Sequence, residues 1–299
     1  MKKHSYGIKR IIGYNFLPHD FLTITYFVFI TFIIIVNYGN VDSAHWYILF
    51  HLAVLFFIFL LAKHDNNKII WLLRFLHLFY PILLFTFIYQ ETGVLNQIFH
   101  KGYFDDLLLK WDNMLFGNSP IFWFYELFPQ KLISEYFHFS YFFYYLMVPL
   151  TFVYIFIKLK TDNLKRNEYI LEYMFTLCFS FYLYYTIFIY FPAVGGRTYV
   201  DIYARNGYIF KKIVDYIYLT QEIDGGAFPS SHVGIAILCL MNLKKVKGVF
   251  YKAMLILVPS LALATVYCGY HYGIDLIGGI VSGFVFYYIG RTIYRLIWG

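Results

Sequence analysis

Residues 21–38 read FLTITYFVFITFIIIVNY, a run of 18 residues without one charged side chain. A helix needs about 20 predominantly apolar residues to cross the hydrocarbon core of a bilayer. The run therefore predicts a transmembrane helix. Basic residues precede it, as in a secretory signal peptide, but the apolar run is long and no A-x-A cleavage site follows. We expect a retained helix rather than a cleaved leader.

Seven further apolar segments follow along the chain, and the composition agrees with them. Of the 299 residues, 61% are hydrophobic and 14% are charged, whereas a soluble domain carries about a quarter charged residues. We predict an all-α fold, a polytopic transmembrane helical bundle of about eight spans with a range of six to eight. The seven segments lie at about 46–62, 69–90, 134–157, 168–191, 231–243, 253–270 and 273–290.

The basic residues are distributed unevenly between the two sides of these spans. Of the 24 Lys and Arg residues, 16 fall on the side that holds both termini, 7 fall on the opposite side, and Arg74 lies within a span. Cytoplasmic loops carry the excess of basic residues in membrane proteins. We therefore expect a multi-pass protein of the cell membrane with cytoplasmic termini. Because topology accounts for the net charge of +7, the expected partner is the bilayer and not nucleic acid; no obligate protein partner is evident.

One segment outside the spans is amphipathic. Residues 104–117, FDDLLLKWDNMLFG, place apolar residues on one face of a helix and polar residues on the other. We predict a helix that lies in the membrane interface without crossing it; the alternative is a soluble cap over the bundle. The apolar face comprises Phe104, Leu107, Leu108, Trp111 and Leu115, and the polar face Asp105, Asp106, Lys110 and Asn113.

Polar residues interrupt the apolar pattern at three places on the extracytoplasmic side. They are FPAVGGRTY at 191–199, GAFPSSH at 226–232 and VYCGYHYGIDLIGG at 266–279. Since all three fall at span ends on one membrane face, we expect them to converge in one pocket.

The converging residues suit phosphoryl transfer. Arg197 offers a planar cationic fork for phosphate oxygens. Ser230 stands at a helix start, where free N–H groups and the helix dipole favour an anion. His271 and Asp275 are four residues apart, so the carboxylate can fix the tautomer of the imidazole and leave its other nitrogen free to attack. With His232 as a second imidazole, these residues make a candidate site without a metal ion or other cofactor.

Each residue taken alone has a simpler explanation. A histidine at a membrane edge is more often a satisfied polar residue, an H-x-x-x-D pair can be a local hydrogen bond, and Arg197 can be an interfacial anchor. The three cysteines lie in apolar segments without CxxC spacing and are expected to be small buried hydrophobic residues. The combination of residues on one membrane face is what indicates a site.

AFPSSHVG and GYHYGIDLIGG resemble the second and third signature motifs of the type 2 phosphatidic acid phosphatase superfamily. GGR, preceded by FPA, is similar to the Arg-bearing end of its first motif. The resemblance covers roughly residues 100–290, including the D-x-x-L-F-G stretch at 112–117. It implies N-terminal transmembrane helices over residues 1–100 and a phosphatidic-acid-phosphatase-like catalytic helical bundle over residues 101–299.

The resemblance also implies a role for each site residue. His271 would be the nucleophile that forms a phosphohistidine, Asp275 would orient it, and His232 would be the general acid for the leaving group. Arg197 and Ser230 would bind the phosphate, together with Ser231, which stands where the family usually has Gly. No metal ion is implied.

The chain departs from the family pattern at two cations. The third motif usually opens with Ser-Arg, where this chain has Ala264 and Thr265, and the first-motif Lys is missing near Phe191 and Pro192. The loss of the third-motif Arg, together with the GYHYxxD pattern, resembles the branch that contains inositol phosphorylceramide synthases. The phosphate would then be met by fewer cations, with help expected from Arg205, Lys211 or Lys212.

We expect a membrane enzyme that cleaves a lipid phosphate ester through a phosphohistidine on the extracytoplasmic face, as a phosphatase. One alternative is a lipid phosphotransferase of the inositol phosphorylceramide synthase type. Another is a non-enzymatic transporter or channel. The scarcity of charged residues within the spans, apart from Arg74, argues against it, because intramembrane charges often mark ion paths. A catalytically dead scaffold is disfavoured because His232, His271 and Asp275 are all present.

Overall fold

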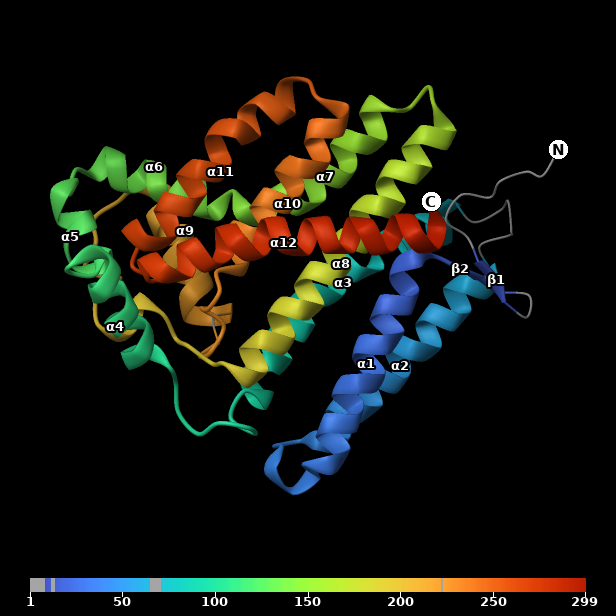
Figure 1. The fold of residues 1–299 in the computed structure, drawn as a ribbon, viewed down its shortest axis with the longest axis horizontal. Helices are drawn as coiled ribbons and strands as arrows, with labels where there is room; N and C mark the ends of the chain where they lie inside the picture. The colour runs from blue at the N-terminus through green and yellow to red at the C-terminus, as the bar shows by residue number, and fades with distance from the viewer. Residues whose placement is uncertain (1–8, 12–13, 65–70, 222) are drawn as a thin grey trace.

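The computed structural model describes residues 9–11, 14–64, 71–221 and 223–299, and it is a helical bundle preceded by one short hairpin (Figure 1). The predicted all-α bundle is therefore confirmed. The elements are β1 (Lys9–Ile11), β2 (Tyr14–Phe16), α1 (Pro18–Val36), α2 (Ala44–His64), α3 (Trp71–Leu95), α4 (Asp105–Phe116), α5 (Pro120–Leu127), α6 (Lys131–Phe142), α7 (Tyr144–Lys158), α8 (Asn163–Tyr190), α9 (Ile209–Gln221), α10 (Ser231–Val246), α11 (Val249–Tyr267) and α12 (Gly273–Trp298), with short 3-10 turns at Tyr38–Asn40 and Gly196–Thr198.

Six of the described helices are long and apolar enough to cross a membrane: α1, α2, α3, α8, α11 and α12. A seventh span arises if α6 and α7 are counted together, although they are bent by 49° at their junction. α10 has 16 residues, shorter than a usual span. Six or seven spans fall within the predicted range. The start of the third predicted segment, at 69 and 70, and basic residues 2, 3 and 68 lie outside the described residues.

The predicted single span at 134–157 is wrong in one respect, because it is two helices with a break at Phe143. The break has a consequence for the site. Tyr141, before it, stacks on His232 with ring centroids 4.9 Å apart, and Tyr144, after it, packs against the same ring at a tilt with centroids 4.2 Å apart. The bend therefore lets two helices present aromatic rings to one histidine.

α10 and α12 pack closely because glycines line their contact. A Cβ added at Gly283 would lie 2.8 Å from the Cα of Gly234, and one added at Gly279 would lie 2.6 Å from the carbonyl oxygen of Ser230. Small residues allow helix backbones to approach in a membrane, where packing drives association. The result is that Ser230 reaches the start of α12, where its N–H donates to the carbonyl of Asp275 at 3.1 Å.

The N-terminal helices pack on α8, which runs between α3 and α12 (Figure 1). Tyr26 of α1 stacks on Tyr182 of α8 at 4.5 Å between ring centroids, and Phe85 of α3 stacks on Phe181 at 4.1 Å. Aromatic stacking adds about 0.5–1.5 kcal/mol per pair beyond the area that it buries. The division of the chain near residue 100 remains a prediction.

Charged groups inside the spans are more numerous than the sequence suggested. The Asp20 carboxylate in α1 lies 2.8 Å from Nε2 of His77 in α3, and Glu91 in α3 lies 2.8 Å from Nε2 of His51 in α2. All four side chains are buried. Intramembrane ionisable groups pair with one another because an isolated charge there is costly. The expectation that the spans carry few charged residues apart from Arg74 was therefore wrong, although each of these carboxylates is paired with a histidine.

The amphipathic helix α4 has 12 residues, too few to cross a bilayer. Its exposed surface is mixed, with Trp111, Met114 and Leu115 uncovered beside Asp106, Lys110 and Asn113. The assignment of Asp105 to the polar outer face was wrong, because Asp105 is 5% exposed. Its carboxylate accepts hydrogen bonds from a loop of the site, described below. The position of α4 in the interface remains a prediction.

A basic cluster lies at the helix ends opposite the polar motifs. Lys245 near the end of α10 and Arg291 near the end of α12 both pair with Glu172, near the start of α8, at 2.7 and 2.8 Å. His232 and Asp275 lie at the other ends of α10 and α12. This arrangement agrees with basic residues on one membrane face and the motifs on the other.

We predict that the motif side is extracytoplasmic. Cysteine at Tyr208, which is 48% exposed, should react with an impermeant thiol reagent in intact cells. Cysteine at Val249, 82% exposed at the opposite helix ends, should react only after lysis. The wild-type chain supplies the background, since Cys178, Cys239 and Cys268 are buried. Labelling of Val249→Cys but not Tyr208→Cys in intact cells would invert the topology.

Candidate active site

The three polar segments meet in the structure. A parallel bridge joins Ala193 to Gly226, and the N–H of Ala227 donates to the carbonyl of Ala193 at 2.9 Å. Gly195 has a φ of 98°, and a Cβ there would overlap the carbonyl oxygen of Tyr270. Only glycine combines this left-handed backbone with so close an approach. The first glycine of the GGR sequence therefore joins the first polar segment to the third.

His271 lies between a carboxylate and a hydroxyl. Its Nδ1 is 3.3 Å from Oδ2 of Asp275, and its Nε2 is 3.3 Å from Oγ of Ser230. Oδ2 of Asp275 also accepts the N–H of Tyr272 at 2.9 Å, which fixes the carboxylate. A carboxylate at Nδ1 selects the tautomer whose Nε2 carries a lone pair. Contacts of 3.3 Å are long, as catalytic hydrogen bonds often are before a substrate binds.

The start of α10 provides an anion site beside His271. Ser230 is the N-cap residue, but its side chain does not cap its own helix and turns instead to the imidazole. The first N–H groups of a helix have no partner within the helix, and the dipole there favours negative charge. Ser231 is the first residue of α10 and is buried. A phosphate at this position would contact both Ser230 and His271.

His232 lies in an aromatic cage, one residue further along α10. Its Nε2 is 3.1 Å from the hydroxyl of Tyr141, and its buried Nδ1 has no hydrogen-bond partner. Its ring centroid is 5.7 Å from that of His271. The two imidazoles are close enough for one phosphate group between them to contact both rings.

Arg197 is linked to His232 through two tyrosines. The guanidinium lies over the ring of Tyr218 at 5.8 Å, the hydroxyls of Tyr218 and Tyr141 are 2.7 Å apart, and Tyr141 contacts His232. The structure also pairs Arg197 with Asp224 at 2.8 Å. Arg197 is therefore at the margin of the site, and binding phosphate requires it to exchange one anionic partner for another.

The other candidate cations differ in their surroundings. Arg205 is 7% exposed, lies over the Tyr125 ring at 4.7 Å, and has a buried Nη1 without a hydrogen-bond partner. Burial lowers the pKa of this guanidinium from its usual value. A Cβ at Gly269 would lie 3.0 Å from its Nη2. Lys211 is buried and pairs with Asp215, while Lys212 is exposed. Arg205 is the candidate packed against the turn that carries His271.

Two carboxylates of α4 hold the backbone of the site, and sequence reasoning assigned them no role. Asp105 accepts the N–H groups of Val194 and Gly195 at 2.9 and 2.8 Å and the hydroxyl of Tyr272 at 2.8 Å. It thereby ties the first polar segment to the third. The hydroxyl of Thr198 lies 3.4 Å from the same carboxylate. Because these four polar groups surround it, the carboxylate can be buried.

Asp112 performs the same task at the start of α12. It accepts the N–H groups of Gly273 and Ile274 at 3.1 and 2.7 Å and the hydroxyl of Ser119. A carboxylate at a helix N-terminus is stabilised by the unpaired N–H groups and the dipole. Asp105 and Asp112 are seven residues apart and therefore lie on one face of the helix. This spacing was the feature of the sequence that could have identified both carboxylates as part of the site.

A scan against family models matches residues 107–289 to the PAP2 superfamily. The chain belongs to the PAP2 superfamily. No curated protein and no solved structure matched the chain. The match includes α10, α12 and the loops between α8 and α10, and with them every candidate site residue, whereas α1, α2 and α3 lie outside it.

Members of the PAP2 superfamily are phosphoesterases and phosphotransferases, so membership supports an enzyme of that general type acting on lipid phosphates. The apolar helices support a multi-pass membrane protein. Within the described residues, no group of three or more His, Cys, Asp or Glu side chains is placed to hold a metal ion.

We predict that Arg197→Ala and Arg197→Lys both reduce kcat/KM for a lipid phosphate by about 100-fold, since charged hydrogen bonds contribute roughly 1.5–3 kcal/mol each. Lysine keeps the charge but loses the two-pronged geometry. Lys101→Ala is the matched control, because Lys101 is an exposed cation on the same side and is not a candidate phosphate ligand. If Arg197→Ala keeps the wild-type kcat/KM and Arg205→Ala loses it, Arg205 and not Arg197 binds the phosphate.

Proposed function

We propose that the protein is a lipid phosphate phosphatase that cleaves a phosphate ester through a phosphohistidine on the extracytoplasmic face of the cell membrane. The observation that carries the proposal is the series of contacts from Asp275 through His271 to Ser230, which is the N-cap of α10. It combines an oriented nucleophile with a site for the anion that the nucleophile attacks.

The chemistry has two steps. Nε2 of His271 attacks phosphorus, the bond between phosphorus and the lipid oxygen breaks, and His232 donates a proton to that oxygen, which releases the lipid alcohol. His232 then takes a proton from water, the water oxygen attacks the phosphohistidine, and phosphate leaves with His271 restored. Asp275 stabilises the imidazole while it is positively charged. Ser230, the first N–H groups of α10 and Arg197 hold the phosphate oxygens.

A phosphotransferase of the inositol phosphorylceramide synthase type is the second candidate, in which a lipid hydroxyl replaces water in the second step. The sparse set of cations favours it. Thr265 stands where the common motif has Arg, and Arg197 already pairs with Asp224. A phosphodiester carries less charge than a phosphomonoester, so a transferase needs fewer cations.

A substrate panel distinguishes the two candidates. Purified protein is incubated with phosphatidate, a prenyl pyrophosphate, phosphatidylglycerophosphate and phosphatidylinositol, with and without ceramide, and both free phosphate and new lipids are measured. Parallel reactions contain excess EDTA, and His271→Ala is the control for contaminating enzymes. Free phosphate without new lipid, unchanged by EDTA, supports the phosphatase. New phospholipid that depends on ceramide supports the transferase. Activity restored after chelation only by one added metal would contradict both schemes.

A further inference from the structure

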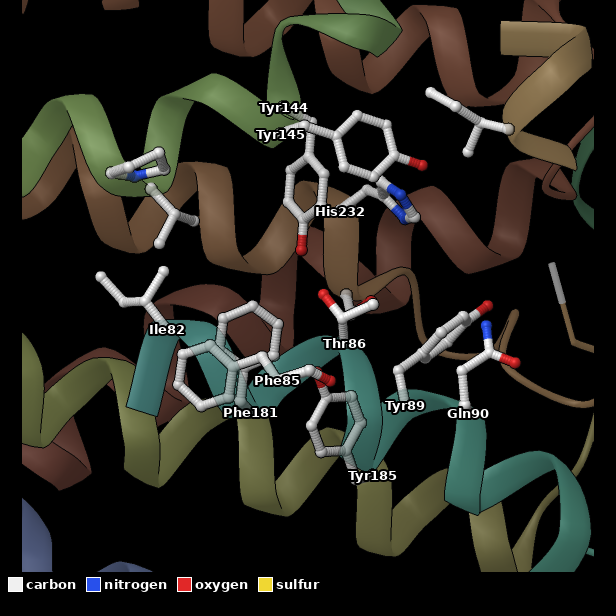
Figure 2. A pocket seen from close by; sticks show the side chains of 14 residues that line it. Ile82, Phe85, Thr86, Tyr89, Gln90, Tyr144, Tyr145, Phe181, Tyr185 and His232 are labelled. Atoms are coloured by element: carbon white, nitrogen blue, oxygen red, sulfur yellow. The ribbon is translucent and has the colours of Figure 1, made fainter. Parts of the chain in front are cut away.

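A pocket of about 470 Å³ opens beside His232. Figure 2 shows its walls: Ile82, Phe85, Thr86, Tyr89 and Gln90 of α3 face Tyr144 and Tyr145 of α7 across the space, and Phe181 and Tyr185 of α8 lie below. The volume is that of a small-molecule site, and such sites are mostly apolar with a few polar groups.

The lining changes from polar to apolar along the pocket. On α3 it runs from Gln90 through Thr86, near His232, to Ile82 at the far end (Figure 2). On α7 it runs from the two tyrosines, which follow the break, to Val148 and Pro149, deeper in the helix. A gradient of this kind matches an amphiphile whose polar end lies at His232 and whose hydrocarbon lies further into the bundle.

The pocket lies on one side of the candidate reaction centre. His232 and Ser231 line it, whereas His271 and Asp275 are not among its described lining residues. In phosphoryl transfer the attacking and leaving atoms lie roughly in line on opposite sides of phosphorus. If His271 attacks, the leaving oxygen points toward His232, and the group attached to that oxygen points into the pocket.

We propose that this pocket binds the hydrocarbon chain of the lipid alcohol that leaves, so that α3 determines which lipid is cleaved. The inference rests on the proposed function for the identity of the leaving group. The inference goes beyond the proposed function because it assigns substrate selection to α3, a helix outside the family match at residues 107–289. The acceptor of a transferase would enter by the same side, since the second step reverses the direction of the first.

The size of the pocket sets an expected chain length. Thr86, near His232, and Ile82 are four residues apart on α3, which is about 6 Å along a helix. An extended chain advances about 1.2 Å per bond, so the pocket holds about five carbons beyond His232. Each buried methylene should raise kcat/KM about fourfold.

The first test measures kcat/KM for a series of n-alkyl phosphates, each below its micelle concentration. The value should rise steeply with chain length and level off near about five carbons. Equal values for ethyl and decyl phosphate would overturn the proposal, because they would show that no chain is bound in the transition state.

The second test fills the pocket. Thr86→Trp places a large ring opposite His232 and should lower kcat/KM for decyl phosphate by about 100-fold, equivalent to roughly three lost methylene contacts. Ethyl phosphate and nitrophenyl phosphate should be cleaved as before. Leu83→Trp is the matched control, because Leu83 is 53% exposed, is not among the lining residues and lies on the same helix.

The outcomes separate the inference from the function on which it rests. Equal losses for decyl and ethyl phosphate in Thr86→Trp, or equal losses for decyl phosphate in the two Trp variants, would overturn the assignment of the pocket. If wild-type protein cleaves none of the phosphates, the proposed function fails, and calorimetry with decyl phosphate then tests whether the pocket binds a hydrocarbon chain. Binding by the wild type and by Leu83→Trp, with none by Thr86→Trp, would support the assignment of the pocket. Equal binding by all three proteins would overturn it.

Discussion

Replacing His271 by alanine is expected to abolish turnover of every lipid phosphate that the protein cleaves. The loss should be roughly 10⁴- to 10⁶-fold, as when a nucleophile is removed from a coupled catalytic group. The physical reason is that the array from Asp275 through His271 to Ser230 presents a single nucleophilic nitrogen to the anion site. Kinetics with a lipid phosphate measure the loss.

His100→Ala is the matched control for removing an imidazole. His100 lies in the loop between α3 and α4, where it stacks on Phe104 at 4.2 Å between ring centroids, and it is not among the candidate site residues. It should retain most of the wild-type rate. A His271→Ala variant that keeps a tenth or more of the rate while folded would remove His271 as the nucleophile.

Replacing His232 by alanine should cost about 100- to 10,000-fold with a lipid phosphate, the contribution of a general acid. The size of the defect should depend on the leaving group. A lipid alkoxide is a poor leaving group without a proton, whereas nitrophenolate leaves unaided. His232→Ala should therefore recover much of the wild-type rate with nitrophenyl phosphate, and His271→Ala should recover none.

Tyr141→Phe serves as the positional control, because it removes the hydroxyl 3.1 Å from Nε2 of His232 and keeps the ring that stacks on it. It should reduce the rate less than His232→Ala does. A His232→Ala defect of the same size with both leaving groups would show that His232 does not act as the acid.

The motifs predicted which residues lie together locally because each contains its own spacing; the chemistry assigned to them remains a prediction. His271 and Asp275 share a helix face through four residues, and Ser230 stands at a helix start marked by Pro229. The convergence of three distant segments followed from counting the spans, since their ends had to lie on one face. The structure brings these segments together through Gly195 and the contact between α10 and α12.

The features of the site that the sequence did not predict depend on contacts between residues far apart in the chain, which no local pattern specifies. Asp105 was assigned only to the polar face of its helix because its hydrogen-bond donors, the N–H groups of Val194 and Gly195, lie 89 and 90 residues away. The break at Phe143 carries no Pro or Gly, and the next residue, Tyr144, packs against the ring of His232. The pairing of Arg197 with Asp224 likewise joins two loops. Such contacts are decided by tertiary packing rather than by sequence spacing.

The central claim is that a phosphoryl group is carried on His271. The most direct measurement is to quench the protein with alkali during turnover of ³²P-labelled nitrophenyl phosphate and to map the label by mass spectrometry. The account predicts label on the peptide that contains His271 in the wild type and in His232→Ala, and none in His271→Ala. Label on another residue, label that persists in His271→Ala, or product formation without any labelled protein would contradict it.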